Sequence, residues 1–257
     1  MHFTKMQGLG NDYLYIRADA LPENAAELSV RLSDRHFGPG ADGMIWILPS
    51  DKADFRMRIF NADGSEARMC GNGIRCVGKY VYDKGMTDKT ELVVETGAGL
   101  RRLCLNVKNG KAVSAAVDMG KAKVETRPGG GELVDVGNPH LVCFVSDAEE
   151  VPLTELGPAL CASVPGGINV EFVQVLGPER LRMRVWERGS GPTLACGTGA
   201  CAAAAAAVSR GFCPVGTPVE VRLDGGTLRI TVAEDGAVRM EGPAEFVYEG
   251  EIESSAP

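Results

Sequence analysis

Two cysteines stand in the same unusual context in the two halves of the chain. Cys70 begins the run Cys-Gly-Asn-Gly and Cys196 begins Cys-Gly-Thr-Gly, and both runs lead into a helix-forming stretch. Met-Arg, an aliphatic residue and an aromatic residue end ten positions earlier, at Phe60 and Trp186. A glycine-rich turn that opens a helix presents unpaired backbone N–H groups and the positive end of the helix dipole. We therefore expect each turn to bind an anion, to lower the pKa of its cysteine and to favour thiolate chemistry.

This context indicates a duplication, because other segments match in the same order. The two cysteines lie 126 positions apart, close to half of the 257 residues. Two further pairs of segments match at nearly this spacing: Gly10-Asn11 with Gly137-Asn138, and residues 40–43 with residues 166–169. A repeat this long predicts two copies of one domain. We expect an N-terminal half at 1–118 that carries Cys70 and a C-terminal half at 119–257 that carries Cys196, whose last strand can pack back on the first half.

The predicted elements point to an α+β fold. In each half, short strands separated by glycine-containing turns surround one helix that follows the repeated cysteine. The main expected helices are residues 24–37, 71–84, 153–162 and the stretch after Cys196. This pattern predicts two pseudo-symmetric domains, each a mostly antiparallel sheet wrapped around a central helix.

The composition limits the classes of function. A net charge of −7, with 44% hydrophobic and 24% charged residues, is ordinary for a globular protein and argues against a nucleic-acid partner. The amino terminus has no signal-peptide pattern and no apolar run is long enough to span a membrane, so we expect a cytoplasmic protein with no membrane partner. The eight cysteines are expected to be reduced thiols, and their spacing does not favour a metal site.

Polar residues beside the repeated segments are candidates for the rest of a site. His140 follows Gly137-Asn138-Pro139, and Glu187-Arg188 directly follows Trp186. Alone, the histidine is more often a structural group, and the charge pair more often a solvated strand end. Four asparagines fall in equivalent turn regions of the two halves: Asn11, Asn61, Asn138 and Asn169. Amides that converge on one site can bind carboxylate and ammonium groups, whereas each asparagine in isolation is only a turn residue. Paired thiols in a symmetric setting suggest a symmetric reaction, namely racemisation or epimerisation.

The sequence resembles the diaminopimelate epimerases over nearly its whole length. Six segments carry the resemblance: KMQGLGNDY at 5–13, GADG at 40–43, FNADGSEARMCGNGIRC at 60–76, GNPH at 137–140, INVEFVQ at 168–174 and ERGSGPTLACGTGACA at 187–202. Two positions depart from the family pattern, Pro39 and Pro192, and the second could reshape the loop before Cys196.

The resemblance implies an isomerase that needs no cofactor. Cys70 and Cys196 would act as thiolate base and thiol acid on opposite faces of the alpha carbon. The reacting carboxylate would be held by Gly71, Asn72, Gly197 and Thr198. The distal amino-acid end would meet Asn61, Asn138, Asn169 and Arg188. His140 and Glu187 would tune the thiols or relay protons, and Asn11 would lie beside them. The resemblance also implies an amino-acid substrate, a homodimer and two domains that close on the substrate.

Three other functions stay open. A racemase of another amino acid in the same superfamily would use the same two cysteines. A duplicated amino-acid-binding protein would not require them, and an isomerase of the phenazine-synthesis type would lack them. The presence of both cysteines favours the epimerase.

Overall fold

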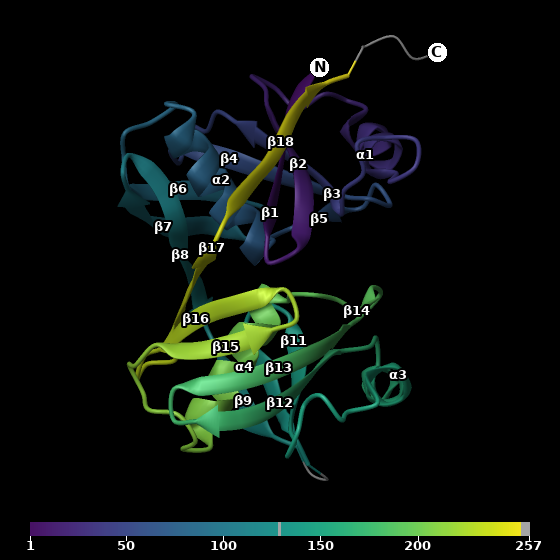
Figure 1. Ribbon diagram of the computed structural model, residues 1–257, viewed down its shortest axis with the longest axis vertical. Coiled ribbons are helices and arrows are strands. Elements are labelled where there is room, and N and C mark those ends of the chain that lie inside the picture. Colours follow the sequence, from purple (N-terminus) through teal and green to yellow (C-terminus); the bar gives the residue numbers. More distant parts are fainter. Residues whose placement is uncertain (128–129, 253–257) are drawn as a thin grey trace. The chain divides into compact units, whose positions relative to one another are not determined.

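The chain forms two compact units in the computed structural model, which describes residues 1–127 and 130–252. One unit is Met1–Val117 together with the C-terminal segment that starts at Pro243, and the other is Asp118–Gly242. The final strand thus groups with the first unit, as Figure 1 shows. The last five residues of the expected range 119–257 lie outside the described part of the chain.

The first unit is one mixed sheet with two helices. Its strands hydrogen-bond in the order β18-β1-β2-β3-β4-β6-β7-β8, with the short β5 paired to β4. The elements are β1 (His2–Gly8), β2 (Asn11–Arg17), α1 (Ala25–Ser33), β3 (Gly43–Leu48), β4 (Phe55–Asn61), β5 (Glu66–Ala67), α2 (Gly71–Asp83), β6 (Glu91–Thr96), β7 (Gly99–Lys108), β8 (Lys111–Lys121) and β18 (Glu245–Glu251).

The second unit repeats this arrangement. Its strands follow the order β9-β10-β11-β12-β13-β15-β16-β17, with the short β14 paired to β13. The elements are β9 (Lys123–Thr126), β10 (Glu132–Asp135), β11 (Pro139–Phe144), α3 (Leu153–Ala162), β12 (Asn169–Gly177), β13 (Arg180–Glu187), β14 (Gly191–Pro192), α4 (Gly197–Ser209), β15 (Val219–Leu223), β16 (Gly226–Val232) and β17 (Ala237–Pro243).

The two units match ladder by ladder. In each unit the third and fourth strands in the order pair in parallel, as do the fifth and sixth, and all the other pairings are antiparallel. The repeated motifs give the correspondence of residues. Gly10-Asn11 opposite Gly137-Asn138 places Tyr13 opposite His140, and residues 40–43 opposite residues 166–169 place Ile45 opposite Glu171. The register agrees, because Leu14 pairs with Met44 as Leu141 pairs with Val170. The predicted duplicated α+β fold is confirmed.

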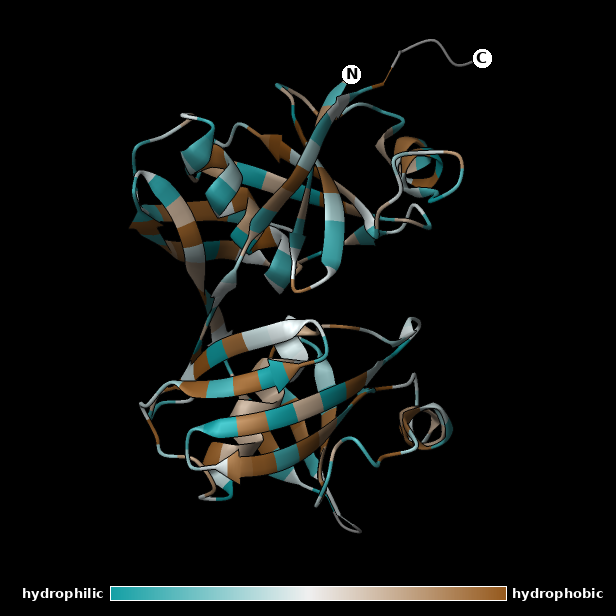
Figure 2. Ribbon diagram, viewed as in Figure 1, coloured by the Kyte–Doolittle hydropathy of each residue, from teal (hydrophilic) through white to brown (hydrophobic). Residues whose placement is uncertain are grey.

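In each unit the sheet packs around one central helix. In the second unit α4 contacts strands from β9 to β16, and residues 200–207 of this helix are all buried. Seven of these eight residues are alanines, whose small side chains let the strands approach the helix on all sides. The hydropathy colouring in Figure 2 shows hydrophobic residues alternating with polar ones along the strands, the pattern of a sheet with one buried face.

Two local predictions differ from the structure. The helix expected at residues 24–37 ends at Ser33, because Asp34 has an extended backbone and its carboxylate accepts the backbone N–H groups of His36 and Phe37. The strand β1 was not predicted, because its polar residues interrupt the apolar pattern. No helix in residues 1–127 and 130–252 is long and apolar enough to cross a membrane.

Candidate active site

Each repeated cysteine is the N-cap of a central helix. Cys70 precedes α2 and Cys196 precedes α4, both with extended backbone. The Cys70 sulfur accepts the N–H of Gly73 at 3.3 Å, and the Cys196 sulfur accepts the N–H of Gly199 at 3.4 Å. The sulfur thus takes the place that a Ser or Asp oxygen usually holds at a helix start. The predicted carboxylate-binding residues form the first turns: Gly71 and Asn72 in α2, Gly197 and Thr198 in α4.

In the first unit an asparagine faces the thiol. The Cys70 thiol donates to Oδ1 of Asn11, with 3.4 Å between sulfur and oxygen. The amide nitrogen of Asn11 donates to Asp42 at 2.7 Å, which fixes its carbonyl toward the sulfur. The buried Tyr13 also hydrogen-bonds with this pair, and burial raises its pKa. The Asn11 carbonyl oxygen therefore accepts the hydrogen bond that the Cys70 thiol donates.

A cluster of charged residues stabilises the segment that carries Asn11. Asp12 forms ion pairs with Lys5 at 2.8 Å and with Arg35 at 2.7 Å, and Arg35 also reaches Asp42. Burial acts to raise the pKa of Asp12, but the bonds from Arg35 and Lys5 outweigh it and the pKa lies below its usual value. The cluster anchors the start of β2, where Asn11 lies.

In the second unit a chain of hydrogen bonds leads to the thiol. The Cys196 sulfur and the Thr198 hydroxyl lie 3.6 Å apart. The amide nitrogen of Asn138 donates to that hydroxyl at 3.4 Å, and its carbonyl oxygen lies 3.2 Å from Nε2 of His140. Nδ1 of His140 is 2.7 Å from a carboxylate oxygen of Glu171, and both side chains are fully buried. Both ring nitrogens of His140 are thus engaged by side chains of its own unit.

Glu187 is the carboxylate beside Cys196. It lies at the end of β13 and accepts a hydrogen bond from the Thr193 hydroxyl. Burial raises the pKa of Glu187, partly opposed by hydrogen bonds from Thr193 and Cys196. A carboxylate with a raised pKa that hydrogen-bonds a thiol is suited to take its proton.

The predicted direction of the two cysteine pKa shifts is wrong. Burial raises the pKa of Cys70, although the N–H groups of Gly73 and Asn72 and the charge of Arg75 act to lower it. The pKa of Cys196 is raised further, by burial and then by the negative charges of Glu187 and Glu171. The helix start does favour each thiolate, but desolvation is the larger effect.

The remaining predicted residues lie in two groups. Asn61 ends β4, and its amide donates to Ser65 at 3.0 Å within its own turn. Asn169 and Arg188 contact each other, because Oδ1 of Asn169 accepts the backbone N–H of Arg188 at 2.9 Å. The guanidinium of Arg188 is exposed and donates to the carbonyl of Gly166 at 3.2 Å. The described contacts connect neither group to a cysteine.

Sequence reasoning missed three residues near the thiols. Glu171 lies within the quoted segment at 168–174 but received no role, and Tyr13 and Asp42 were also passed over. A signal was present for two of them: aligning the repeats places Tyr13 opposite His140 and Glu171 opposite Ile45. A glutamate opposite an isoleucine on a buried strand is a strong departure from symmetry.

The other six cysteines are free, like Cys70 and Cys196. Cys76 and Cys201 are buried in α2 and α4. Cys104 is exposed. Within the described ranges, no group of three or more His, Cys, Asp or Glu side chains could hold a metal ion.

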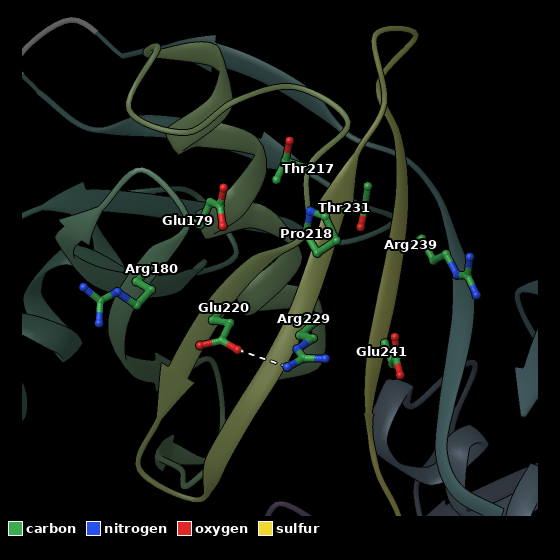
Figure 3. Close-up of a pocket in the computed structure, with 9 residues that line it drawn as sticks. All are labelled: Glu179, Arg180, Thr217, Pro218, Glu220, Arg229, Thr231, Arg239 and Glu241. Carbon is green, nitrogen blue, oxygen red and sulfur yellow. Dashed lines mark hydrogen bonds and ion pairs between the residues drawn. The ribbon is translucent and has the colours of Figure 1, made fainter. Parts of the chain in front are cut away.

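A surface hollow of about 580 Å³ lies away from these residues, on β13, β15, β16 and β17. Charged side chains line it, among them Glu220 and Arg229, whose ion pair at 3.3 Å bridges β15 and β16 (Figure 3). None of the predicted site residues contributes to it.

Comparison with known proteins gives one family. The sequence model described as "Diaminopimelate epimerase" matches residues 3–125 and 132–247. A protein of that name from Methanococcus maripaludis is 49% identical over 98% of this chain and 100% of its own. One from Bacteroides thetaiotaomicron is 50% identical over 98% and 97%.

Solved structures share the fold at low identity. A phenazine biosynthesis protein of the PhzF family from Bacillus anthracis superposes with a TM-score of 0.80 at 16% identity, covering 98% of both chains. A hydroxyproline epimerase from Agrobacterium vitis gives 0.72 at 17% identity, covering 98% of this chain and 90% of the other. At such identities the likeness concerns the fold alone.

Proposed function

The chain belongs to the diaminopimelate epimerase family, a family of isomerases, and from this premise we propose that it interconverts LL- and meso-diaminopimelate by proton transfer at the alpha carbon. One observation carries the proposal: two cysteines cap equivalent helices of a duplicated fold. The product would serve the synthesis of lysine and peptidoglycan precursors. The reaction needs no cofactor if the protein itself provides a base, an acid and a site that stabilises the carbanion.

The two thiols are assigned complementary roles on one alpha carbon. In one direction the thiolate of one cysteine takes the alpha proton and becomes a thiol, leaving a carbanion stabilised by the carboxylate. The thiol of the other cysteine gives its proton to the opposite face and becomes a thiolate. Configuration is inverted and the two cysteines have exchanged protonation states. The reverse reaction uses them in the opposite order.

The N-terminal turns of α2 and α4 are proposed to supply the electrostatic stabilisation of the carbanion. The first-turn backbone N–H groups of Gly71, Asn72, Gly197 and Thr198 are proposed to hold the reacting carboxylate. Charge builds up on that carboxylate as the carbanion forms, and fixed N–H dipoles stabilise it without reorganising. Support comes from the two equivalent first turns, in which each sulfur already accepts an N–H of its helix.

The two cysteines have different hydrogen-bond partners, a carboxylate beside Cys196 and a neutral amide beside Cys70. Glu187 is proposed to take the proton of Cys196, since the two are hydrogen-bonded and burial raises the pKa of Glu187. Cys70 instead donates to the neutral carbonyl of Asn11, so it holds its proton until another base is present. His140 is proposed to tune Cys196 through Asn138.

The distal amino-acid end is proposed to bind Asn61, Asn138, Asn169 and Arg188. The exposed guanidinium of Arg188 suits a carboxylate, and the asparagines offer both donors and acceptors. Asn169 supports the proposal because it fixes the backbone of Arg188. A substrate with a second amino-acid end is favoured over a simpler amino acid on this ground.

Deuterium exchange at the alpha carbon tests the proposal. LL-diaminopimelate is incubated with the protein in D₂O under reducing conditions, and the meso product and its deuterium content are measured. Cys70→Ala and Cys196→Ala should each abolish interconversion. The matched controls are Cys76→Ala and Cys201→Ala, which remove buried thiols from the same two helices.

Each contrary result has a defined meaning. Interconversion that persists in either repeated-cysteine variant would refute the two-thiol mechanism. Exchange with another amino acid, but none with diaminopimelate, would make the protein a racemase of that amino acid. A homodimer and a cytoplasmic location are further proposals that rest on the family resemblance, and sedimentation of the purified protein tests the first.

A further inference from the structure

The side chain of Arg188 packs against a turn of two glycines. The turn is Gly166-Gly167, between α3 and β12. Nη1 of Arg188 donates to the carbonyl oxygen of Gly166 at 3.2 Å. A Cβ added to Gly167 would lie 2.9 Å from Cδ and 3.1 Å from Cγ of Arg188, so the aliphatic stem occupies the space that a side chain at position 167 would fill. The turn thus contacts both the stem and the guanidinium.

The same segment also holds the backbone of Arg188. Oδ1 of Asn169, two residues after Gly167, accepts the backbone N–H of Arg188 at 2.9 Å. Ile168, between them, is buried in a hydrophobic cluster of the second unit and anchors the segment to the core. Residues 166–169 therefore fix Arg188 at three points, although its guanidinium is exposed to solvent.

The two glycines are needed for different reasons. Gly167 donates its N–H to the carbonyl of Val164 at 2.9 Å, which closes a turn with Pro165 and Gly166 at its centre. Proline followed by a glycine with positive φ, here +82°, is typical of a type II turn. A Cβ on Gly166 would meet nothing within 4 Å, whereas one on Gly167 would overlap the arginine. Gly166 is therefore explained by the backbone alone, and Gly167 also by the side chain beside it.

The first unit shows that the repeated fold itself does not require a glycine at this position. The repeat spacing of 126 positions places Ala41 opposite Gly167 and Ala62 opposite Arg188. The ladders agree, because β3 pairs with β4 in the same register as β12 with β13. Ala41 is buried and has a negative φ, and Ala62 has no stem that could lie on it. The glycine, with a φ of +75°, thus occurs in the unit that has the arginine.

We propose that Gly167 is a positioning residue that sets substrate specificity: its missing side chain lets the Arg188 stem lie in the turn, and this fixes the guanidinium for a carboxylate at the distal end of the substrate. The inference rests on the proposed function, which assigns that carboxylate to Arg188. A guanidinium binds a carboxylate through two parallel hydrogen bonds only in a matching orientation. A side chain that is already held loses less conformational freedom when the ligand binds. An alanine at position 167 would displace the stem, because the exposed arginine moves more easily than the anchored turn.

Gly167→Ala is the decisive variant, and Gly216→Ala is its matched control. Gly216 also belongs to the second unit and has nearly the same backbone, with a φ of +72°, but a Cβ there would meet nothing within 4 Å. Both variants introduce the strain of an alanine at positive φ, so both should lower the urea midpoint by similar amounts. Crystal structures without ligand, of the native protein and both variants, should show that the bond from Arg188 to Gly166 is lost in Gly167→Ala alone.

Binding measurements test the effect on substrate choice. Calorimetry is carried out in the Cys196→Ala background, where the proposed two-thiol reaction cannot proceed. L-Lysine is the matched ligand, because it differs from LL-diaminopimelate only in lacking one carboxylate. Gly167→Ala should weaken diaminopimelate binding roughly tenfold, the effect of losing a hydrogen bond between charged groups, and leave lysine binding unchanged. Gly216→Ala should change neither.

Arg188→Ala shows whether Gly167 acts through the arginine. It should weaken diaminopimelate binding at least as much as Gly167→Ala does. Adding Gly167→Ala to it, which copies Ala41 and Ala62 of the first unit, should have no further effect. The proposal is overturned if Arg188 keeps its position in Gly167→Ala, if that variant binds the two ligands with unchanged or equally weakened affinity, or if the two substitutions weaken binding additively.

The crystal structures separate this inference from the proposed function. They contain no ligand, so they decide whether Gly167 positions Arg188 even if the substrate assignment is wrong. A native protein that fails to interconvert LL- and meso-diaminopimelate would refute the proposed function and leave this placement of the arginine intact.

Discussion

Gly73 keeps the first turn of α2 close to the sheet, and an added methyl group there should be destabilising. A Cβ at position 73 would lie 2.6 Å from Cδ1 of Ile45. Carbon atoms in good contact are about 3.5–4.0 Å apart, so the overlap is about 1 Å. Overpacking of this kind costs about 1–3 kcal/mol, against a gain of about 1 kcal/mol from replacing glycine by alanine in a helix. We expect Gly73→Ala to lower the free energy of unfolding by about 1 kcal/mol.

Ile45→Val removes the clashing atom and makes the reasoning testable. Alone it should cost about 0.5–1.5 kcal/mol, as a lost buried methyl group does. The next neighbours of the added Cβ are then Cβ and Sγ of Cys70, at 3.4 and 3.5 Å, which are ordinary contacts. In the Ile45→Val background, Gly73→Ala should therefore be neutral or stabilising. The double-mutant coupling should be about 1–3 kcal/mol.

Urea unfolding of the four proteins measures this coupling, provided that the dependence on denaturant stays constant. Additive effects, with Gly73→Ala equally harmful in both backgrounds, would refute the steric argument. Deuterium exchange on the same samples relates the packing to function. If the turn also sets the position of the Cys70 sulfur, Gly73→Ala should slow exchange and the double variant should recover it.

Three further predictions concern charge. Asp42→Ala frees the Asn11 amide, so turnover should fall roughly tenfold through loss of alignment, with a much smaller change in the urea midpoint. Because burial and nearby carboxylates raise the Cys196 pKa more than burial raises that of Cys70, alkylation across a pH series should modify Cys70 at lower pH; the reverse order would contradict the burial argument. Asp12 has a folded-state pKa below its usual value, so its stabilisation is present above the unfolded pKa of about 3.9 and is lost as pH falls through the folded value. Asp12→Asn should therefore flatten the rise in urea midpoint that occurs below about pH 5, and an unchanged rise in that range would exclude the ion pairs as its cause.

The sequence predicted most strands and helices well because the two signals used, turn glycines and apolar periodicity, are local. Turn glycines and apolar periodicity placed most strands and the helix at residues 153–162 at their observed positions. The duplication could be read from spacing alone. The strand β1 escaped prediction because the adjacent polar residues Thr4 and Lys5 interrupt the apolar pattern between Phe3 and Met6, and because one of its two pairing partners, β18, lies at the other end of the chain.

The direction of the cysteine pKa shifts could not be predicted in this way. A helix start after Cys-Gly-x-Gly correctly indicates N–H groups at the sulfur, but the net pKa depends on how deeply the sulfur is buried and which carboxylates approach it. Glu187 was found from its place in the motif. Glu171 was not, because its partner His140 is 31 positions away and only the parallel pairing of β11 and β12 brings them together.

The difference between the half-sites has a kinetic consequence under the proposed function. Each direction of the reaction starts from the opposite protonation pattern of the two cysteines. A change that stabilises one thiolate shifts the population of free enzyme toward the pattern used by one stereoisomer. The equilibrium between the stereoisomers cannot change, so the ratio of the two kcat/KM values stays fixed while the ratio of the two kcat values is free to move. Glu171→Ile should alter the second ratio and leave the first constant. The duplication gives two thiols at equivalent helix starts, and the carboxylates of Glu187 and Glu171, which raise the pKa of Cys196, make the two electrostatically unequal.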